Sequence, residues 1–124
     1  MKLSKAQIEV MNTAKAEIDY ARSHSLREWA EKEEALDEGC YDRIIENASD
    51  YGSTKEEMKK RLDERIENRA NGYKEYYENE KNGIVLTHCN SRTLEKLESL
   101  GLIEIIYDSN GSDYGIDEIK VLNY

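Results

Sequence analysis

Apolar residues recur every three or four positions through the first part of the chain, a spacing that predicts amphipathic helices. The first helix is expected over residues 5–23, because Ser4 and Gln7 have the spacing of a capping box and the apolar positions behind them repeat at helical intervals. Ser25 and Glu28 have the same spacing and open a second periodic stretch. Two helices in close succession are therefore predicted at the start of the chain.

The second periodic stretch leads into a long helical arm. It keeps its helical period past Gly39, where the helix is expected to kink or end, up to a turn just before Thr54. Thr54 and Glu57 then open a long helix with one narrow apolar stripe, which suits pairing with a single other helix better than burial in a globular core. Gly72 marks a point where this helix breaks or bends. Residues 25–80 are thus predicted to form a helical arm or hairpin with its two halves packed antiparallel.

The pattern changes from helical spacing to strands towards the C-terminus. A short β-prone run at 84–86 precedes a helix over 90–100 with leucines on one face, and Gly101 is placed to take the left-handed position that ends it. Segments 102–107 and 116–122 are typical of two strands joined by a turn-rich loop, which predicts a C-terminal β-hairpin. The predicted fold class is α+β and mostly helical. We expect a single domain made of a first helix (1–24), the arm (25–82) and a half with a helix and a β-hairpin (83–124).

Composition and charge narrow the possible functions. The formal net charge is −9 at pH 7, so the field of the whole molecule repels nucleic acid and acidic membrane surfaces and favours basic partners. No segment has the pattern of a signal peptide, a membrane span or a lipidation motif, and the chain is expected to be cytoplasmic with no membrane partner. Cys40 and Cys89 lack the neighbouring ligands of a zinc site and are expected to be reduced, partly buried thiols.

Residues with catalytic or metal-binding chemistry are sparse. His24 and His88 do not occur at a metal-binding spacing, and the sequence has no Gly-rich phosphate loop and no Gly-x-Ser-x-Gly turn. Cys89 follows His88, but neighbours on a strand point to opposite faces, which argues against a thiolate pair. The carboxylate clusters lack the loop and the turn glycine of a calcium site. The sequence thus predicts no enzyme activity, no cofactor and no metal site.

One C-terminal motif resembles a known family. It reads Ser91-Arg92-Thr93-Leu94-x-x-Leu97-Glu98-x-Leu100-Gly101-Leu102-Ile103 and is followed by the predicted hairpin. This motif resembles the third helix and wing of winged helix-turn-helix domains, and the N-terminal pattern Leu3-x-x-x-Gln7-x-x-Val10 looks like their first helix. The family has a single short helix where this chain has residues 25–82. The resemblance therefore implies a winged-helix variant with an enlarged second element or an inserted arm.

The resemblance implies one candidate function, that of a DNA-binding transcriptional regulator whose third helix lies in the major groove. The residues that would contact DNA are Ser91, Arg92, Thr93 and Lys96 on that helix, and Lys59, Arg61, Arg65 and Arg69 on the arm. From residue 83 onward, however, three basic residues stand against seven acidic ones, and each missing cation weakens DNA binding. The basic residues of the arm also alternate with Asp and Glu at spacings that form ion pairs along a solvated helix.

The favoured candidate function is non-catalytic binding of a protein with a basic surface. Its expected contacts are acidic residues and tyrosines, the latter because Tyr is enriched at protein interfaces. They are Glu31, Glu33, Glu34, Asp37 and Glu38 on the arm, Tyr73, Tyr76 and Tyr77 near its end, and Asp108, Asp113, Asp117 and Glu118 in the wing. For Tyr73 and Tyr77, packing of the arm is an equal alternative.

The style of the sequence resembles that of small proteins encoded by phages and mobile elements of low-GC bacteria. That resemblance implies an inhibitor of a host nucleic-acid-binding defence protein, such as a CRISPR nuclease, with acidic faces that occupy a groove meant for DNA. A third alternative is a structural module that forms a homodimer through the arm. The sequence thus favours protein binding over DNA binding and self-pairing.

Overall fold

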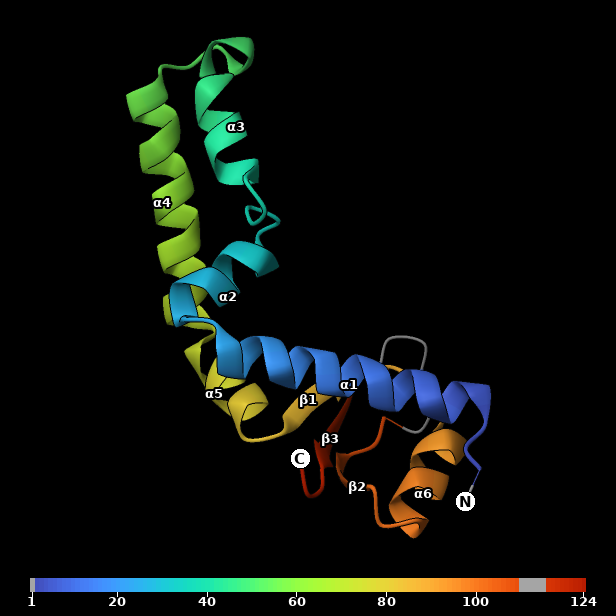
Figure 1. The fold of residues 1–124 in the computed structure, drawn as a ribbon. Coiled ribbons are helices and arrows are strands. Elements are labelled where there is room, and N and C mark those ends of the chain that lie inside the picture. Colours follow the sequence, from blue (N-terminus) through green and yellow to red (C-terminus); the bar gives the residue numbers. More distant parts are fainter. Residues whose placement is uncertain (1, 110–115) are drawn as a thin grey trace. The chain divides into compact units, whose positions relative to one another are not determined.

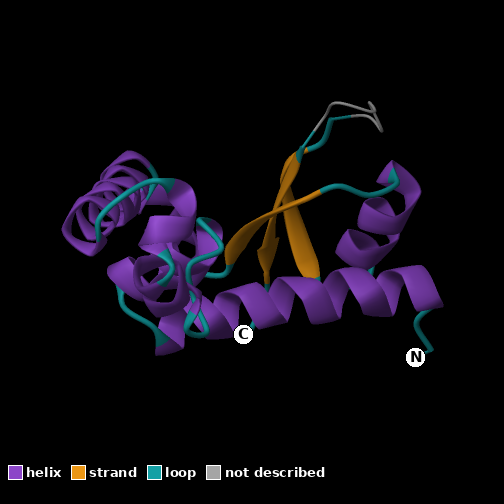
Figure 2. Ribbon diagram, turned by 90° about the horizontal axis from the view of Figure 1, so that it is seen from above, coloured by secondary structure: helices purple, strands orange, loops and turns teal. Residues whose placement is uncertain are grey.

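The computed structural model describes residues 2–109 and 116–124, and its contacts group the chain into two compact units. The sheet unit consists of the residues up to Ser23 together with Glu78–Tyr124. The hairpin unit is His24–Tyr77. Helices make up most of the described chain and a small antiparallel sheet completes it, so the predicted fold class, mostly helical α+β, is confirmed (Figures 1 and 2).

The hairpin unit is built from helices that fold back on one another. Its elements are α2 (Leu26–Glu33), α3 (Cys40–Glu46), the 3-10 helix η1 (Ala48–Tyr51), α4 (Lys55–Gly72) and the first residues of α5 (Lys74–Lys81). Both α2 and α3 pack against α4, which runs back alongside α3 (Figure 1). This is the antiparallel packing expected of the arm, and α4 ends at Gly72, where the sequence predicts either a break or a bend.

The helix that follows Ser25 is shorter than its apolar period suggests. It ends at Glu33, well before Gly39. Ala35 and Glu38 adopt positive φ angles of 57° and 55°, which interrupt a right-handed helix. Leu36 lies between them and is buried. Leu36 therefore lies in the connection between α2 and α3, and its side chain is buried although it is not part of a helix.

The sheet unit combines two helices with three strands. Its remaining elements are α1 (Lys5–Ser23), β1 (Ile84–Thr87), α6 (Ser91–Ser99), β2 (Ile103–Tyr107) and β3 (Asp117–Val121). The strands are antiparallel in the order β1-β3-β2. β2 and β3 form the predicted hairpin, while the pairing of β1 with β3 is a feature that the sequence did not predict. α1 and α6 both contact this sheet (Figure 2).

One face of the sheet packs on the two helices and forms the core of the unit. Alternate strand residues point to this face because successive side chains of a strand point in opposite directions. The buried cluster comprises Val85, Ile103, Ile119 and Val121 from the strands, Met11, Ala14 and Ile18 from α1, and Leu94 and Leu97 from α6. The other face of the sheet is left to carry the exposed side chains.

Helix starts agree with the predicted caps. The amide of Ser4 donates to Gln7 Oε1 (2.8 Å) and the amide of Gln7 donates to Ser4 Oγ (3.2 Å), which completes a capping box. Ser25 and Glu28 form the same reciprocal pair at the start of α2. The hydroxyl of Thr54 accepts from the amide three residues later and caps α4. Local sequence thus determines where these helices begin.

Both ends of α6 also agree with the sequence. The side chain of Asn90 caps its start. At its end Gly101 adopts a φ of 74°, its amide donates to the carbonyl of Glu98 (2.9 Å), and the amide of Leu102 donates to the carbonyl of Leu97 (3.1 Å). These two bonds form a Schellman motif. The motif turns the chain from α6 directly into β2.

The element before α6 is a strand. β1 ends at Thr87 and α6 begins at Ser91, and the preceding helix, α5, comes before β1. A helix-turn-helix places a helix directly before the recognition helix. The likeness to winged-helix domains therefore rests on α1, α6 and the hairpin, and membership of that family stays a prediction.

Candidate functional site

Exposed apolar side chains cross the face of the sheet that points away from α1 and α6. The strand register places Leu86 of β1 and Tyr107 of β2 on either side of Glu118 of β3. Leu86 is 41% exposed and Tyr107 is 60% exposed. Their neighbours Val85 and Ile119 point into the core, so this row points outward.

A β-bulge adds to this row. The register of β2 shifts between Ile105 and Tyr107, which inserts Ile106 as an extra residue. Ile106 is exposed, and so is Ile116, which directly precedes β3. We call Leu86, Ile106, Tyr107, Ile116 and Glu118 the outer sheet patch. Exposed aromatic and aliphatic side chains that gather on one face are typical of a protein interface.

Of the outer sheet patch, only Glu118 was predicted from the sequence as a contact, and the four apolar residues were not. The strand alternation carried a signal for one of them. Ile106 stands two positions after the exposed Glu104, so a strict period of two places an apolar side chain on the solvent face. That the other members lie close together could not be predicted from the sequence, because it depends on the pairing of β1 with β3.

Asp117 was predicted to contact a partner and is instead buried, with 0% of its surface exposed. Its carboxylate accepts hydrogen bonds from the amide (2.7 Å) and hydroxyl (2.8 Å) of Ser109 and from the amide of Cys89 (3.4 Å). Burial opposes ionisation, but these bonds outweigh it and hold the pKa of Asp117 below its usual range. Asp117 joins the segments that follow β1 and β2 and offers no contact to a partner. Asp113 lies outside the described residues.

Two residues that were assigned to different functions bond to each other. The hydroxyl of Ser91, a predicted DNA contact, donates to the carboxylate of Asp108, a predicted partner contact, at 3.0 Å. Both side chains are partly buried. Of the other residues predicted to read DNA, Arg92 and Lys96 are exposed on α6 and Thr93 is half-buried. The helix therefore presents two cations to solvent.

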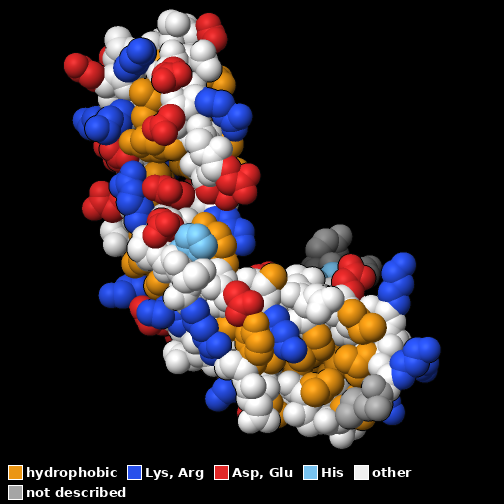
Figure 3. All heavy atoms as spheres, viewed as in Figure 1, with side chains coloured by type: hydrophobic (Ala, Val, Ile, Leu, Met, Phe, Trp, Pro, Cys, Tyr) orange, Lys and Arg blue, Asp and Glu red, His pale blue; other side chains and the backbone are white. Residues whose placement is uncertain are grey.

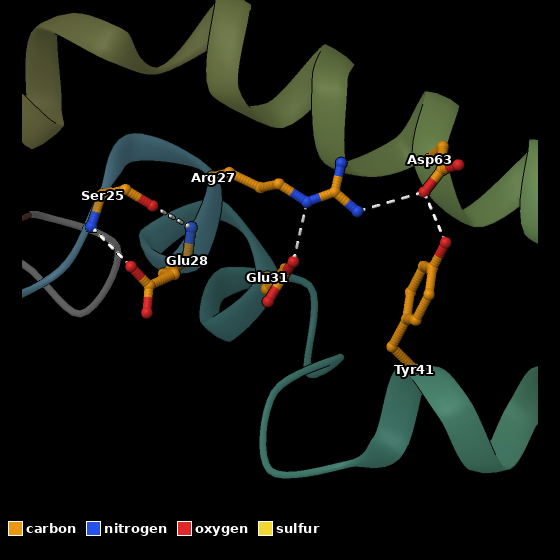
Figure 4. Close-up of polar contacts among 6 residues, drawn as sticks. All are labelled: Ser25, Arg27, Glu28, Glu31, Tyr41 and Asp63. Carbon is orange, nitrogen blue, oxygen red and sulfur yellow. Dashed lines mark hydrogen bonds and ion pairs between the residues drawn. The ribbon is translucent and has the colours of Figure 1, made fainter.

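In the hairpin unit, polar side chains join α2 and α3 to α4. Arg27 of α2 pairs with Glu31 (2.9 Å) and with Asp63 of α4 (3.1 Å), and Tyr41 of α3 donates its hydroxyl to Asp63 (2.6 Å) (Figure 4). The hydrogen bond from Tyr41, followed by the one from Arg27, holds the pKa of Asp63 below its usual range. Glu31 was predicted to face a partner, and its charge is instead used within the unit.

A second ion-pair group involves three further residues that were predicted as contacts. Glu34 accepts from Arg69 Nε (2.8 Å) and from Arg65 Nη2 (3.0 Å), and these two bonds lower the pKa of Glu34. The guanidinium of Arg69 also lies 4.4 Å from the ring centre of Tyr73. Glu34 is therefore not an unpaired acid for a partner, and Arg65 and Arg69 are not unpaired cations for phosphates. These pairs join α4 to the end of α2, whereas the sequence predicted pairs with acids of the same helix.

The remaining charged candidates of the hairpin unit are on its surface. Glu33 and Glu38 are exposed and Asp37 is half-buried, while Lys59 and Arg61 are exposed on α4. Figure 3 shows acidic and basic side chains intermixed over the visible side of this unit. On that side the hairpin unit thus carries a mixed-charge surface instead of a single acidic face.

The three tyrosines near the end of the arm separate into two groups. Tyr77 is buried, donates its hydroxyl to the carbonyl of His24 (2.6 Å) and lies beside Trp29 with ring centres 5.8 Å apart. Packing accounts for this residue. Tyr73 and Tyr76 are exposed, with ring centres 5.6 Å apart. They keep the capacity to contact a partner.

An open groove of about 490 Å³ lies in the sheet unit between α1 and the end of β1. Its lining includes Glu9 and Glu17 of α1 and the segment 87–90. Burial, with the nearby charges of Asp117 and Asp108, raises the pKa of the Cys89 thiol in this segment. A raised pKa keeps a thiol protonated at neutral pH, which disfavours nucleophilic chemistry at Cys89.

Comparisons with known proteins give no relative: no family model, curated protein or solved structure matches the chain. Within residues 2–109 and 116–124, no group of three or more His, Cys, Asp and Glu side chains is placed to hold a metal ion. The helices in those ranges also lack the combination of length and apolar character that crossing a bilayer requires. The surfaces of the two units are therefore the basis for inferring function.

Proposed function

We propose that the chain is a non-catalytic module that binds a protein with a basic surface, and that the outer sheet patch is its main contact. The observation that carries this proposal is the gathering of exposed Leu86, Ile106, Tyr107 and Ile116 around Glu118. On docking, the apolar side chains would lose contact with water and the carboxylate would pair with a cation of the partner. Tyr107 is the best single anchor, because tyrosine buries a large area and keeps a hydroxyl for a hydrogen bond.

The charge of the chain supports a nucleic-acid-binding protein as the partner. Both parts of the sequence are acidic, with a net charge of −5 over His24–Tyr77 and −4 over the rest. Such a field speeds encounter with a basic surface and repels free nucleic acid. In keeping with the resemblance to small phage-encoded proteins, we propose that the partner is a host defence protein and that binding inhibits it in the cytoplasm.

The test is capture of proteins from a nuclease-treated lysate of the source cells. Wild-type chain is compared with the double variant Ile106→Ser/Tyr107→Ser, and Tyr51→Ser is the control because Tyr51 is similarly exposed, at 64%, and lies in the other unit. We expect a protein that wild type and Tyr51→Ser both retain and that the double variant loses. Equal capture by all three would show that the outer sheet patch is not the contact.

DNA binding is the second candidate, and one observation favours it: Arg92 and Lys96 are exposed on α6, the helix that resembles a recognition helix. Fluorescence titration of a labelled random duplex at low salt tests it. Binding that weakens steeply with added salt, and that Arg92→Ala reduces, would support a DNA-binding regulator. We expect no such binding.

A further inference from the structure

The two edges of the sheet differ in how their backbone groups are used. β1 and β2 are the edge strands, because β3 lies between them. On the β2 edge, the amide of Ile105 donates to the carboxylate of Glu98 (2.7 Å), so a side chain of α6 covers this position. Such covers prevent an edge strand from pairing with another chain. Within the described residues, no side-chain hydrogen bond of this kind covers the β1 edge.

The register shows which backbone groups of β1 point outward. The amide of Val121 in β3 donates to the carbonyl of Gly83 (2.9 Å), so Gly83 forms a hydrogen-bonded pair with β3. Hydrogen-bonded and non-hydrogen-bonded pairs alternate along an antiparallel ladder. Val85 therefore also turns its N–H and C=O groups towards β3, whereas Ile84 and Leu86 turn theirs to the open edge. This edge can accept another strand.

The groove described above adjoins the end of this edge, at Leu86 and Thr87 of β1. Its lining includes Leu86 and continues through Thr87 to Asn90 on one side and along α1 on the other. Its volume of about 490 Å³ is within the range of about 300–1,000 Å³ that is typical of small-ligand sites. The groove can thus hold a short extended segment against the backbone of β1.

The charge of the groove indicates the chemistry of that segment. Glu9 and Glu17 line it, and its described lining contains no Lys or Arg. These carboxylates would attract basic side chains of an approaching peptide and would repel an acidic peptide. The complementary occupant is therefore an extended peptide segment that carries lysine or arginine.

We propose that β1 takes up an extended basic segment of the partner as an additional strand, with its lysine or arginine side chains directed to Glu9 and Glu17. This inference rests on the proposed function, because the segment belongs to the same basic protein that contacts the outer sheet patch. Backbone hydrogen bonds at Ile84 and Leu86 would provide the affinity, and the two carboxylates would provide the selectivity.

The probe is a short acetylated peptide of alternating lysine and valine, titrated into the ¹⁵N-labelled full chain and followed by NMR. The amide resonances of Ile84 and Leu86 are expected to shift. Two further peptides carry N-methyl groups on the odd-numbered or on the even-numbered residues. Only every second peptide amide bonds to β1, so one of these peptides should bind about tenfold more weakly and the other should lose much less affinity. If neither methylated peptide loses affinity, or if both lose it equally, strand addition is overturned.

The charge requirement is tested on the protein side. The double variant Glu9→Gln/Glu17→Gln should bind the peptide several-fold more weakly than Glu95→Gln/Glu104→Gln, a control with the same change in net charge at exposed positions outside the groove. Equal weakening, or equal binding of a peptide with glutamate in place of lysine, would remove the proposed selectivity.

The outcome can be separated from that of the proposed function. If the peptide shifts the resonances of Tyr107 and Glu118 but not that of Ile84, which lies in β1 outside the outer sheet patch, strand addition is wrong and binding at the outer sheet patch stands. If the peptide does not bind at millimolar concentration, strand addition is also wrong, and the capture experiment alone decides the proposed function.

Discussion

Asp117 shows how much one buried side chain organises in the sheet unit. The sequence places it among the acidic residues of a wing, yet its carboxylate accepts three hydrogen bonds from Ser109 and Cys89 and is removed from solvent. A buried carboxylate is stable only when donors satisfy it. Its role is therefore to fix the two connections at one end of the sheet, next to the outer sheet patch.

Replacing Asp117 by Ala should destabilise the sheet unit by about 2–4 kcal/mol, because two backbone amides lose their acceptor inside the protein. Asp117→Asn should cost less, since the amide oxygen still accepts. The free energy of unfolding is measured by urea denaturation, with the β3 amide resonances as the signal for this unit. A cost below about 0.5 kcal/mol for Asp117→Ala would contradict the structural role.

The stability provided by Asp117 should depend on pH. Its pKa is lower in the folded protein than in the unfolded chain, so the ionised form stabilises the fold above the unfolded pKa of about 3.9. This contribution is lost as the pH falls through the folded pKa. The difference in unfolding free energy between wild type and Asp117→Asn is therefore expected to shrink between pH 7 and pH 3. A difference that grows on acidification would show that the pKa is raised.

At the scale of elements, local signals determine where helices begin and end. The capping pairs at Ser4 and Ser25 and the left-handed Gly101 all occur where the sequence predicts them. Gly52 is another left-handed position, with a φ of 67°, at the end of η1. Gly72, the last residue of α4, is not among the glycines with positive φ. Added Cβ atoms would meet nothing within 4 Å at either site.

These two glycines form a matched pair for a test of backbone conformation. Gly52→Ala should destabilise the hairpin unit by about 1–2 kcal/mol, because an L-residue is strained at positive φ. Gly72→Ala should stabilise it by about 0.4–1 kcal/mol, because alanine restricts the unfolded chain and tolerates the helical conformation. Fluorescence of Trp29, the one tryptophan in the sequence, reports unfolding of this unit. Equal effects of the two substitutions would contradict the assigned conformations.

The sequence predicted the elements well and the surfaces poorly, for a physical reason. Caps, turns and apolar periods are local, and they identified α1, α4, α6 and the C-terminal hairpin. α2 ends at Glu33, before its apolar period does. The chain then turns at Ala35 and buries Leu36, and this tertiary contact is not visible in the local pattern. The outer sheet patch depends on the pairing of β1 with β3 and on the bulge at Ile106, both long-range features. Likewise, spacing could not show which acids pair across helices, as Glu34 does with Arg69.

At the scale of the whole molecule, both units are acidic, and they differ in how their surface side chains are arranged. The hairpin unit uses part of its charge internally, through Arg27, Glu34 and their partners, and its visible side is mixed in sign (Figure 3). The hairpin unit also exposes Tyr51, Tyr73 and Tyr76, whereas in the sheet unit the exposed apolar side chains gather around Glu118. In the proposed function, the overall excess of acids would attract a basic partner at long range and the outer sheet patch would supply the contact. A single domain and a cytoplasmic location stay predictions.

The most direct measurement is the affinity of the purified captured partner for the chain by isothermal titration calorimetry. Ile106→Ser/Tyr107→Ser is expected to weaken binding at least about tenfold, since loss of an interface anchor commonly costs about 2 kcal/mol or more, and Tyr51→Ser should bind as wild type does. Circular dichroism verifies that each variant is folded. Wild-type affinity in the double variant would contradict the claim that the outer sheet patch is the binding surface.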